Sequence, residues 1–168
     1  VANGSTLTIL PGTIIKLKNG SNIDMLYTAN PKIICKGTPE LPIIFTQADN
    51  KASDLFFHDG EVEYTYFLNM NLDKGSTSIT FRNIIIKNCV FKNNRADGGK
   101  MDGGGAVSTV GKLTVVGCVF QNNKIRTAGS AIFLLAINKN VRCVIKNSKF
   151  IKNKSKGKIK TYNYPFKS

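Results

Sequence analysis

The chain has 168 residues, of which 42% are apolar, and its formal net charge is +14 at pH 7. This length and composition suit one folded domain with its own core and exclude a disordered chain. No run of 18 apolar residues occurs, so the sequence predicts no transmembrane segment. The opening VANGSTLTIL lacks the basic and long apolar segments of a signal peptide. The chain is also compatible with being part of a larger chain or assembly.

The N-terminal third contains short apolar stretches that are broken by proline and glycine. LTILPGTIIKL (7–17), PKIICKGTPELPIIFT (31–46) and DLFF (54–57) have the β-branched and aromatic content of strands. Four of the five prolines lie in this part, at positions 11, 31, 39 and 42. We therefore expect residues 1–60 to form irregular coils.

A sequence unit then repeats through the rest of the chain. NCVFKNN (88–94) returns as GCVFQNN (117–123) and, more loosely, as NSKFIKN (147–153). A fourth copy, without the final asparagine, lies in EVEYTYFLNM (61–70). The phenylalanines that align in the four copies are Phe67, Phe91, Phe120 and Phe150. A period of 24–30 residues is typical of a solenoid, because one such unit cannot bury its apolar side alone.

Apolar residues alternate within each unit, as in Ile84-x-Ile86, which is the period of a strand. The continuous apolar run AIFLLAI (131–137) is interpreted as a buried strand because of its β-branched and aromatic content and its place in the repeat. The sequence thus predicts an all-β fold, a right-handed parallel β-helix of about six to seven coils. One domain would span residues 1–168, with regular repeat coils at 61–155 and a basic tail at 156–168.

Stacked coils place equivalent residues in ladders along the axis. The predicted structural ladders are the four phenylalanines, the pair Cys89 and Cys118, and the row Asn94, Asn123 and Asn153. In the asparagine row each side-chain amide could bond to the next one. The cysteines are interpreted first as a buried, reduced pair, and a disulfide is the alternative.

The charge is distributed unevenly. Residues 1–102 hold 11 Lys and Arg and all 10 acidic residues, whereas residues 103–168 hold 13 Lys and Arg and no acid. A solvated lysine-rich surface is one explanation, and an anionic partner, either an anionic glycan or an acidic protein surface, is the other. The candidate partner-binding residues are Lys146, Lys149, Lys152, Lys154, Lys156, Lys158 and Lys160. Nucleic acid is an unlikely partner, since only the tail mixes lysines with aromatic rings.

FKNN (91–94), FQNN (120–123) and FIKN (150–153), together with GGAV (104–107), resemble the FxxN and GGA[ILV] motifs of polymorphic outer membrane protein repeats. The N-terminal stretches resemble the opening coils of right-handed β-helix proteins of the pectate-lyase-like class. The resemblance implies a surface-exposed passenger region that acts in adhesion. Phe67-Leu-Asn-Met departs from FxxN, and AGSAI (128–132) is a degraded GGA copy.

The chain offers few candidates for catalysis. Asp54, Asp59, Glu61 and Glu63 form its one dense acidic group, beside His58. If a strand runs through them, Asp59, Glu61 and Glu63 share its outward face, which favours a surface patch over a metal site, for which they are weak candidates. The cysteines lack zinc-site spacing, and the glycine-rich loop RADGGKMDGGG (95–105) lacks the lysine and helix of a phosphate-binding loop. We expect no catalytic residue, no metal and no cofactor.

Three functions remain open at this point. The first is a non-catalytic structural or adhesive module at the cell surface or outside the cell, which binds an anionic partner through its basic half. The second is a carbohydrate-active enzyme, or the relic of one, that uses the acidic group. The third is a structural subunit of a large assembly, whose basic half docks an acidic neighbour. Neighbouring coils or subunits could also stack at the ends of the solenoid.

Overall fold

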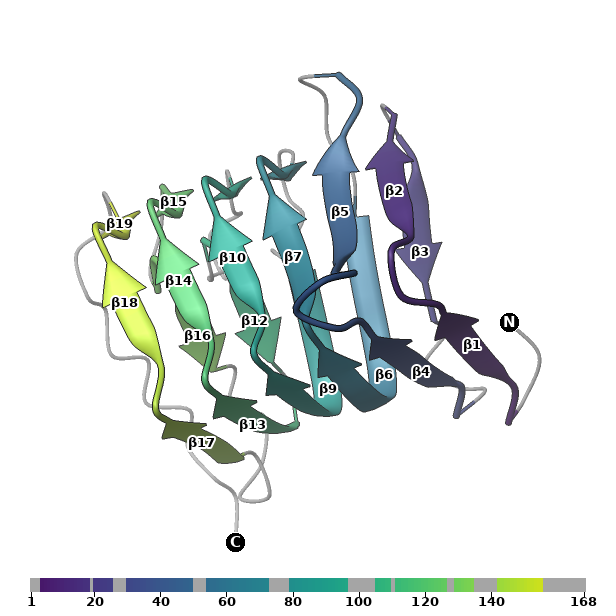
Figure 1. Ribbon diagram of the computed structural model, residues 1–168. Coiled ribbons are helices and arrows are strands. Elements are labelled where there is room, and N and C mark those ends of the chain that lie inside the picture. Colours follow the sequence, from purple (N-terminus) through teal and green to yellow (C-terminus); the bar gives the residue numbers. More distant parts are fainter. Residues whose placement is uncertain are drawn as a thin grey trace, which may run out of the picture.

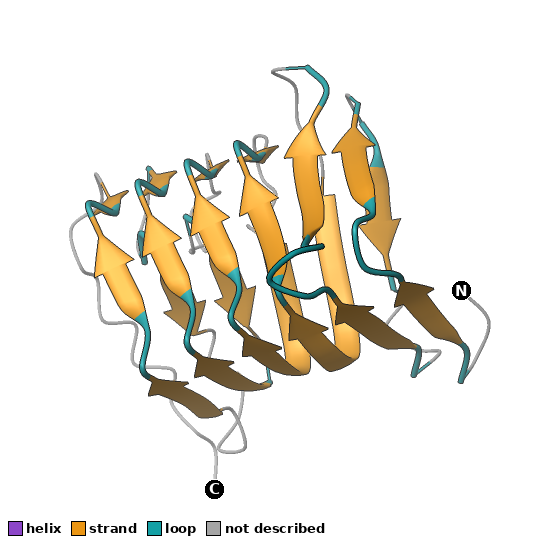
Figure 2. Cartoon of the chain, in the orientation of Figure 1, coloured by secondary structure: helices purple, strands orange, loops and turns teal. Residues whose placement is uncertain are grey.

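In the computed structural model the chain forms a stack of parallel strands (Figure 1). The structure describes residues 4–18, 20–25, 30–49, 54–72, 79–96, 105–109, 111–126, 129–134 and 142–155. Among these residues the regular structure consists of strands, without a helix (Figure 2). The strands are β1 (Thr6–Ile9), β2 (Ile14–Leu17), β3 (Asn22–Asp24), β4 (Lys32–Lys36), β5 (Ile43–Gln47), β6 (Asp54–Glu63), β7 (Thr65–Leu68), β8 (Asn71–Leu72), β9 (Ile79–Lys87), β10 (Val90–Lys92), β11 (Arg95–Ala96), β12 (Val107–Thr109), β13 (Lys112–Val116), β14 (Val119–Gln121), β15 (Lys124–Ile125), β16 (Ile132–Leu134), β17 (Arg142–Lys146), β18 (Lys149–Ile151) and β19 (Lys154–Ser155).

The strands form three parallel sheets, two of which run the length of the stack. One has the order β18-β14-β10-β7-β5-β2, and a shorter one has the order β19-β15-β11-β8. The third, nine-stranded sheet is bent, because β6 and β9 each contribute to two of its limbs. The fold is therefore an all-β parallel solenoid, as the repeat predicts. Its right-handed sense stays a prediction.

The predicted number of coils is too high. The structure shows about four turns rather than six to seven. Only β8, β11, β15 and β19 form the short sheet in the described residues, so four turns carry strands of that sheet as well. The N-terminal strands β1 to β5 pair in the other two sheets. The spacing of apolar stretches overestimates the number of coils, because the described residues of the early turns contribute no strand to the short sheet.

Two corners of each repeat turn require a left-handed backbone. At the corner before the cysteine the φ angles are 42° at Tyr64, 52° at Asn88, 64° at Gly117 and 49° at Asn147. Asparagine and glycine adopt this region more readily than other residues do. The corner therefore recurs at one place in every unit, and it redirects the chain from one sheet to the next (Figure 2).

The second such corner follows the phenylalanine. Its φ angles are 56° at Asn69, 58° at Asn93, 56° at Asn122 and 50° at Lys152. The first asparagine of FKNN and FQNN is thus a backbone requirement, because the chain must reverse its curvature at that residue. Lys152 meets the same requirement without the preference of asparagine for this conformation.

A single hydrophobic core fills the interior of the stack. Inward residues alternate with outward ones along the strands, as in β4, where Ile33 and Cys35 are fully buried between exposed neighbours. The expected buried strand at 131–137 is only partly present. β16 covers Ile132–Leu134, but Leu134 is 40% exposed, and residues 135–137 lie outside the described part.

The division into irregular coils 1–60, regular coils 61–155 and tail 156–168 remains a prediction. The tail itself lies outside the described residues.

Candidate functional site

The phenylalanines of the repeat lie in register and stack ring on ring. Phe67, Phe91 and Phe120 are directly paired between neighbouring strands, and Phe120 pairs with Phe150. Successive ring centroids are 4.9, 4.7 and 4.9 Å apart, with interplanar angles of 8° or less. Parallel strands impose this spacing on identical side chains. The ladder is thus a structural element that holds coil to coil.

The ladder extends one ring further than the repeat suggests. Phe45 pairs with Phe67, and their stacked rings are 5.0 Å apart. A separate stacked pair, Phe57 and Phe81, packs from the opposite side, with centroids 5.6 Å apart. Sequence analysis missed Phe45 because PIIFT is followed by Gln47 and Ala48 rather than by asparagine. The spacing of 22 residues to Phe67 was the available signal.

The asparagine row bonds mainly to the backbone rather than from amide to amide. The Asn94 N–H donates to Asn123 Oδ1 at 3.0 Å, and Asn123 Nδ2 donates to the carbonyl of Phe91 at 2.9 Å. Asn153 makes the same two contacts with the coil before it, to the Asn123 N–H and the Phe120 carbonyl. Within the described part of this row, only Asn123 and Asn153 also bond through their side chains, at 2.8 Å. Each asparagine therefore clamps the preceding coil at its corner.

A second asparagine row was not identified from the sequence. Asn93 Nδ2 donates to Asn69 Oδ1 at 3.1 Å, and Asn122 Nδ2 donates to Asn93 Oδ1 at 3.3 Å. These are the corner residues with positive φ, so one asparagine of each NN pair shapes the backbone and links its amide to the next coil. This row is the amide ladder that the sequence analysis assigned to the neighbouring position.

Cys89 and Cys118 are buried free thiols. Cys89 Sγ donates to the carbonyl oxygen of Val62 at 3.3 Å. Burial raises the pKa of Cys89, and the hydrogen bond from Cys89 lowers the pKa of Cys118. The ladder that they share begins with Thr65 and ends with Ser148, whose hydroxyl accepts the Cys118 N–H at 3.1 Å. This position therefore accommodates small side chains that can donate a hydrogen bond to a carbonyl oxygen.

The intact GGA copy has a steric explanation. Gly105 donates its N–H to the Gly129 carbonyl at 2.8 Å, and a Cβ on Gly105 would collide with the carbonyl oxygen of Ser130. The second glycine is needed wherever another coil packs directly on it. Ser130 is the equivalent residue of the following coil, and it is partly exposed. A serine side chain at this position therefore displaces no described neighbour.

The acidic group does not form one site. β6 bends at Asp59, where φ is 34°, and at Gly60, whose added Cβ would collide with the Ile33 carbonyl oxygen. Asp59 Oδ2 contacts His58 Nδ1 at 3.0 Å, so this carboxylate is engaged at the bend rather than aligned along a regular strand.

The other two acids have partners of their own. Glu61 pairs with Lys36 at 2.6 Å, and the hydrogen bond from this lysine lowers the pKa of the Glu61 carboxyl. Glu63 accepts a long hydrogen bond of 3.5 Å from Asn88. Within the described ranges no three metal-ligating side chains gather in one place. Asp59, Glu61 and Glu63 are thus separate surface contacts.

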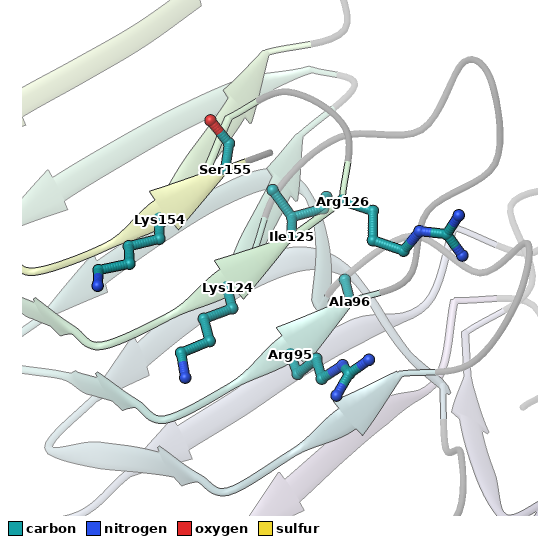
Figure 3. A pocket seen from close by; sticks show the side chains of 7 residues that line it. All are labelled: Arg95, Ala96, Lys124, Ile125, Arg126, Lys154 and Ser155. Carbon is teal, nitrogen blue, oxygen red and sulfur yellow. The ribbon is translucent and has the colours of Figure 1, made fainter. Parts of the chain in front are cut away.

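A row of cations marks the short sheet. Arg95, Lys124 and Lys154 pair directly between β11, β15 and β19. They line a cleft of about 970 Å³ together with Arg126. In Figure 3, Lys124 and Lys154 extend side by side from neighbouring strands, and the two guanidinium groups extend the other way. The remaining lining residues are Ala96, Ile125 and Ser155.

Like charges directly opposite one another in a sheet destabilise it. No carboxylate forms an ion pair with Lys124 or Lys154 in the part of the chain that the structure describes. We call this row the cationic ladder (Arg95, Lys124 and Lys154).

The predicted lysines are placed on several sides of the last coil. Lys146 lies in β17, Lys149 in β18, Lys152 at the corner and Lys154 in β19, and all four are exposed. Lys156, Lys158 and Lys160 lie outside the described residues. Only Lys154 belongs to the cationic ladder. Sequence analysis missed its other members, although a cation follows the last asparagine in FKNNR, FQNNK and FIKNK.

No protein-family model, curated protein or solved structure matches the chain. The established class is thus the one that the strands define, a parallel β-solenoid. The described residues include no helix that could cross a membrane.

Proposed function

We propose that the chain is a non-catalytic structural or adhesive solenoid module that binds an anionic partner through its cationic ladder. The main observation in support of this proposal is the direct pairing of Arg95, Lys124 and Lys154 across adjacent coils. The stack fixes the separation of their paired Cα atoms at roughly 4.8 Å, the spacing of strands in a sheet. A partner with several negative charges offsets their mutual repulsion, and its binding weakens as salt screens the charges.

The resemblance to polymorphic outer membrane protein repeats supports a place outside the cell or at its surface, in a passenger region. The separate contacts of Asp59, Glu61 and Glu63 favour the non-catalytic module over a glycosidase, which needs two carboxylates facing one groove. The cleft supports a linear anionic glycan more than a nucleic acid, because none of its described lining residues carries an aromatic ring for a base to stack on.

Salt-gradient elution from an immobilised sulfated polysaccharide tests the proposal. The double variant Lys124→Gln/Lys154→Gln should elute at clearly lower salt than the unmodified protein. The matched control is Lys16→Gln/Lys32→Gln, which removes the same charge from exposed positions in the early coils. Equal shifts in the two variants would mean that net charge alone causes retention. The proposed site would then be wrong.

An assay of enzymatic turnover distinguishes this proposal from the second function, that of a carbohydrate-active enzyme. The triple variant Asp59→Ala/Glu61→Ala/Glu63→Ala is compared with the unmodified protein on acidic polysaccharides. We expect no turnover from either one. Turnover that disappears with the three carboxylates would contradict the non-catalytic proposal.

A further inference from the structure

The C-terminal coil (residues 142–155) leaves inward apolar side chains uncovered. Ile145 is 47% exposed and Phe150 is 45% exposed, whereas Val115 and Phe120, their partners in register, are fully buried. The residue types are those of an internal coil. This coil therefore has the composition of one on which another layer packs.

The hydrogen bonding of this coil is also open on one side. Among the described residues, β17, β18 and β19 each pair with only one neighbouring strand. The N–H of Asn123 is held by Asn153, but no described side chain provides the same acceptor for the N–H of Asn153. A row of unpaired edge groups is a template for an added strand.

The charge of this coil indicates which kind of strand would bind at its open edge. Residues 142–155 contain five cations and no acid. Carboxylates on an added strand would lie opposite these cations, which favours an acidic partner.

We propose that the open edge of the C-terminal coil docks a strand edge of an acidic protein, which adds a further layer to the stack. The partner strand pairs in parallel with β17 and β18, and its apolar side chains cover Ile145 and Phe150. Its outward carboxylates lie opposite Arg142, Lys146 and Lys149. This surface is distinct from the cationic ladder, because none of these five residues lines the cleft.

The register supplies a probe. We take a synthetic peptide with the sequence of residues 112–121, in which Cys118→Ser removes the thiol. The changes Lys112→Glu, Val116→Glu and Val119→Glu place carboxylates at the positions that pair with Arg142, Lys146 and Lys149 in the structure. The control peptide has lysine at the same three positions. Its apolar inward residues are unchanged.

Binding is measured by fluorescence anisotropy of the labelled peptides and by amide hydrogen exchange of the protein. The acidic peptide should bind and slow the exchange of amides in residues 142–151. The lysine peptide should bind at least about tenfold more weakly. Equal binding of the two peptides, or no binding of the acidic one, overturns the proposal.

Protein variants locate the contact. Phe150→Ser and, separately, Ile145→Ser should each weaken binding of the acidic peptide by at least about tenfold. Ile151→Ser is the control, because Ile151 is 37% exposed but pairs with Gln121 on the outward side. Circular dichroism verifies that each variant is folded. An equal loss with Ile151→Ser contradicts the assigned surface.

Two further readouts exclude other occupants. Sedimentation that shows self-association of the unmodified protein, abolished by Phe150→Ser, would assign the surface to a second copy and overturn the proposal. Stronger peptide binding by a chain that ends at residue 155 would assign it to the protein's own tail, with the same consequence. The Lys124→Gln/Lys154→Gln variant should retain peptide binding. The docking surface and the anion site can therefore fail independently.

Discussion

The central coils and the C-terminal coil use the same motif in different surroundings. Phe91 is fully buried between Phe67 and Phe120, whereas Phe150 occupies the same position of its unit and is 45% exposed. The asparagines differ in the same way, since Asn123 is fully buried and Asn153 is only partly so. In a solenoid the burial of a residue comes from the next coil as much as from its own. Equivalent residues in different coils should therefore contribute differently to the free energy of unfolding.

The largest expected difference is between two phenylalanine truncations. Phe91→Ala should lower the free energy of unfolding by about 3–5 kcal/mol, because it leaves a cavity in the closed part of the ladder. Phe150→Ala should cost about 1–2 kcal/mol, since solvent already reaches the ring and only Phe120 stacks on it among the described residues. Urea denaturation measures both values. Equal losses would contradict the view that the next coil supplies the burial.

The asparagine clamp should show the same contrast at a smaller scale. Asn123→Ala leaves the Asn94 N–H and the Phe91 carbonyl without their partner, and we expect a loss of about 1–3 kcal/mol. Asn153→Ala should cost less, because water reaches the groups that it exposes. Denaturation by urea again gives the values. A larger loss for Asn153→Ala would show that the end coil is closed in solution.

Alkaline pH should destabilise the protein through its buried N-terminal thiol. Burial raises the pKa of Cys35 from 9.0 to about 12. Below pH 9 the thiol is protonated in both states. Above it the unfolded chain loses the proton first, so the free energy of unfolding falls by about 1.4 kcal/mol per pH unit until the folded pKa is reached.

The comparison of Cys35→Ala with Cys143→Ala isolates this effect. The slope of stability between pH 9 and 11 should become clearly shallower in Cys35→Ala. It should change less in Cys143→Ala, because Cys143 is only partly buried in the C-terminal coil, although burial also raises its pKa. Unfolding followed at several pH values gives the slopes. An unchanged slope in Cys35→Ala would contradict the prediction.

The smallest expected effect is a gain in the C-terminal coil. Lys152 has φ of 50°, where the other coils have asparagine. Lys152→Asn should stabilise the protein by about 0.5–1 kcal/mol, because asparagine tolerates the left-handed conformation better. The new side chain can also extend the row of Asn69, Asn93 and Asn122. Lys149→Asn, in the regular strand β18, is the control and should give no gain in thermal denaturation.

Part of the site was readable from the sequence, because the repeat fixes which residues are equivalent. Equivalence alone places Phe91 over Phe120 and Asn94 beside Asn123. It does not show what the amides bond to, since that depends on the depth and rotation of each corner. It also overlooks the cationic ladder, because only the pairing of Arg95, Lys124 and Lys154 in a separate sheet distinguishes these residues from other surface cations.

The sequence by itself determined the solenoid class, the ladder positions and the excess of positive charge toward the C-terminus, because periodicity and composition are local properties of the chain. The tertiary structure decided the number of complete turns, the bend of β6 at Gly60 and the uncovered state of Phe150. Each of these depends on which backbone packs on which, and neighbours in a stack are about 20 to 30 residues apart in sequence. A short motif determines the conformation of its own coil but does not determine which coil packs on it.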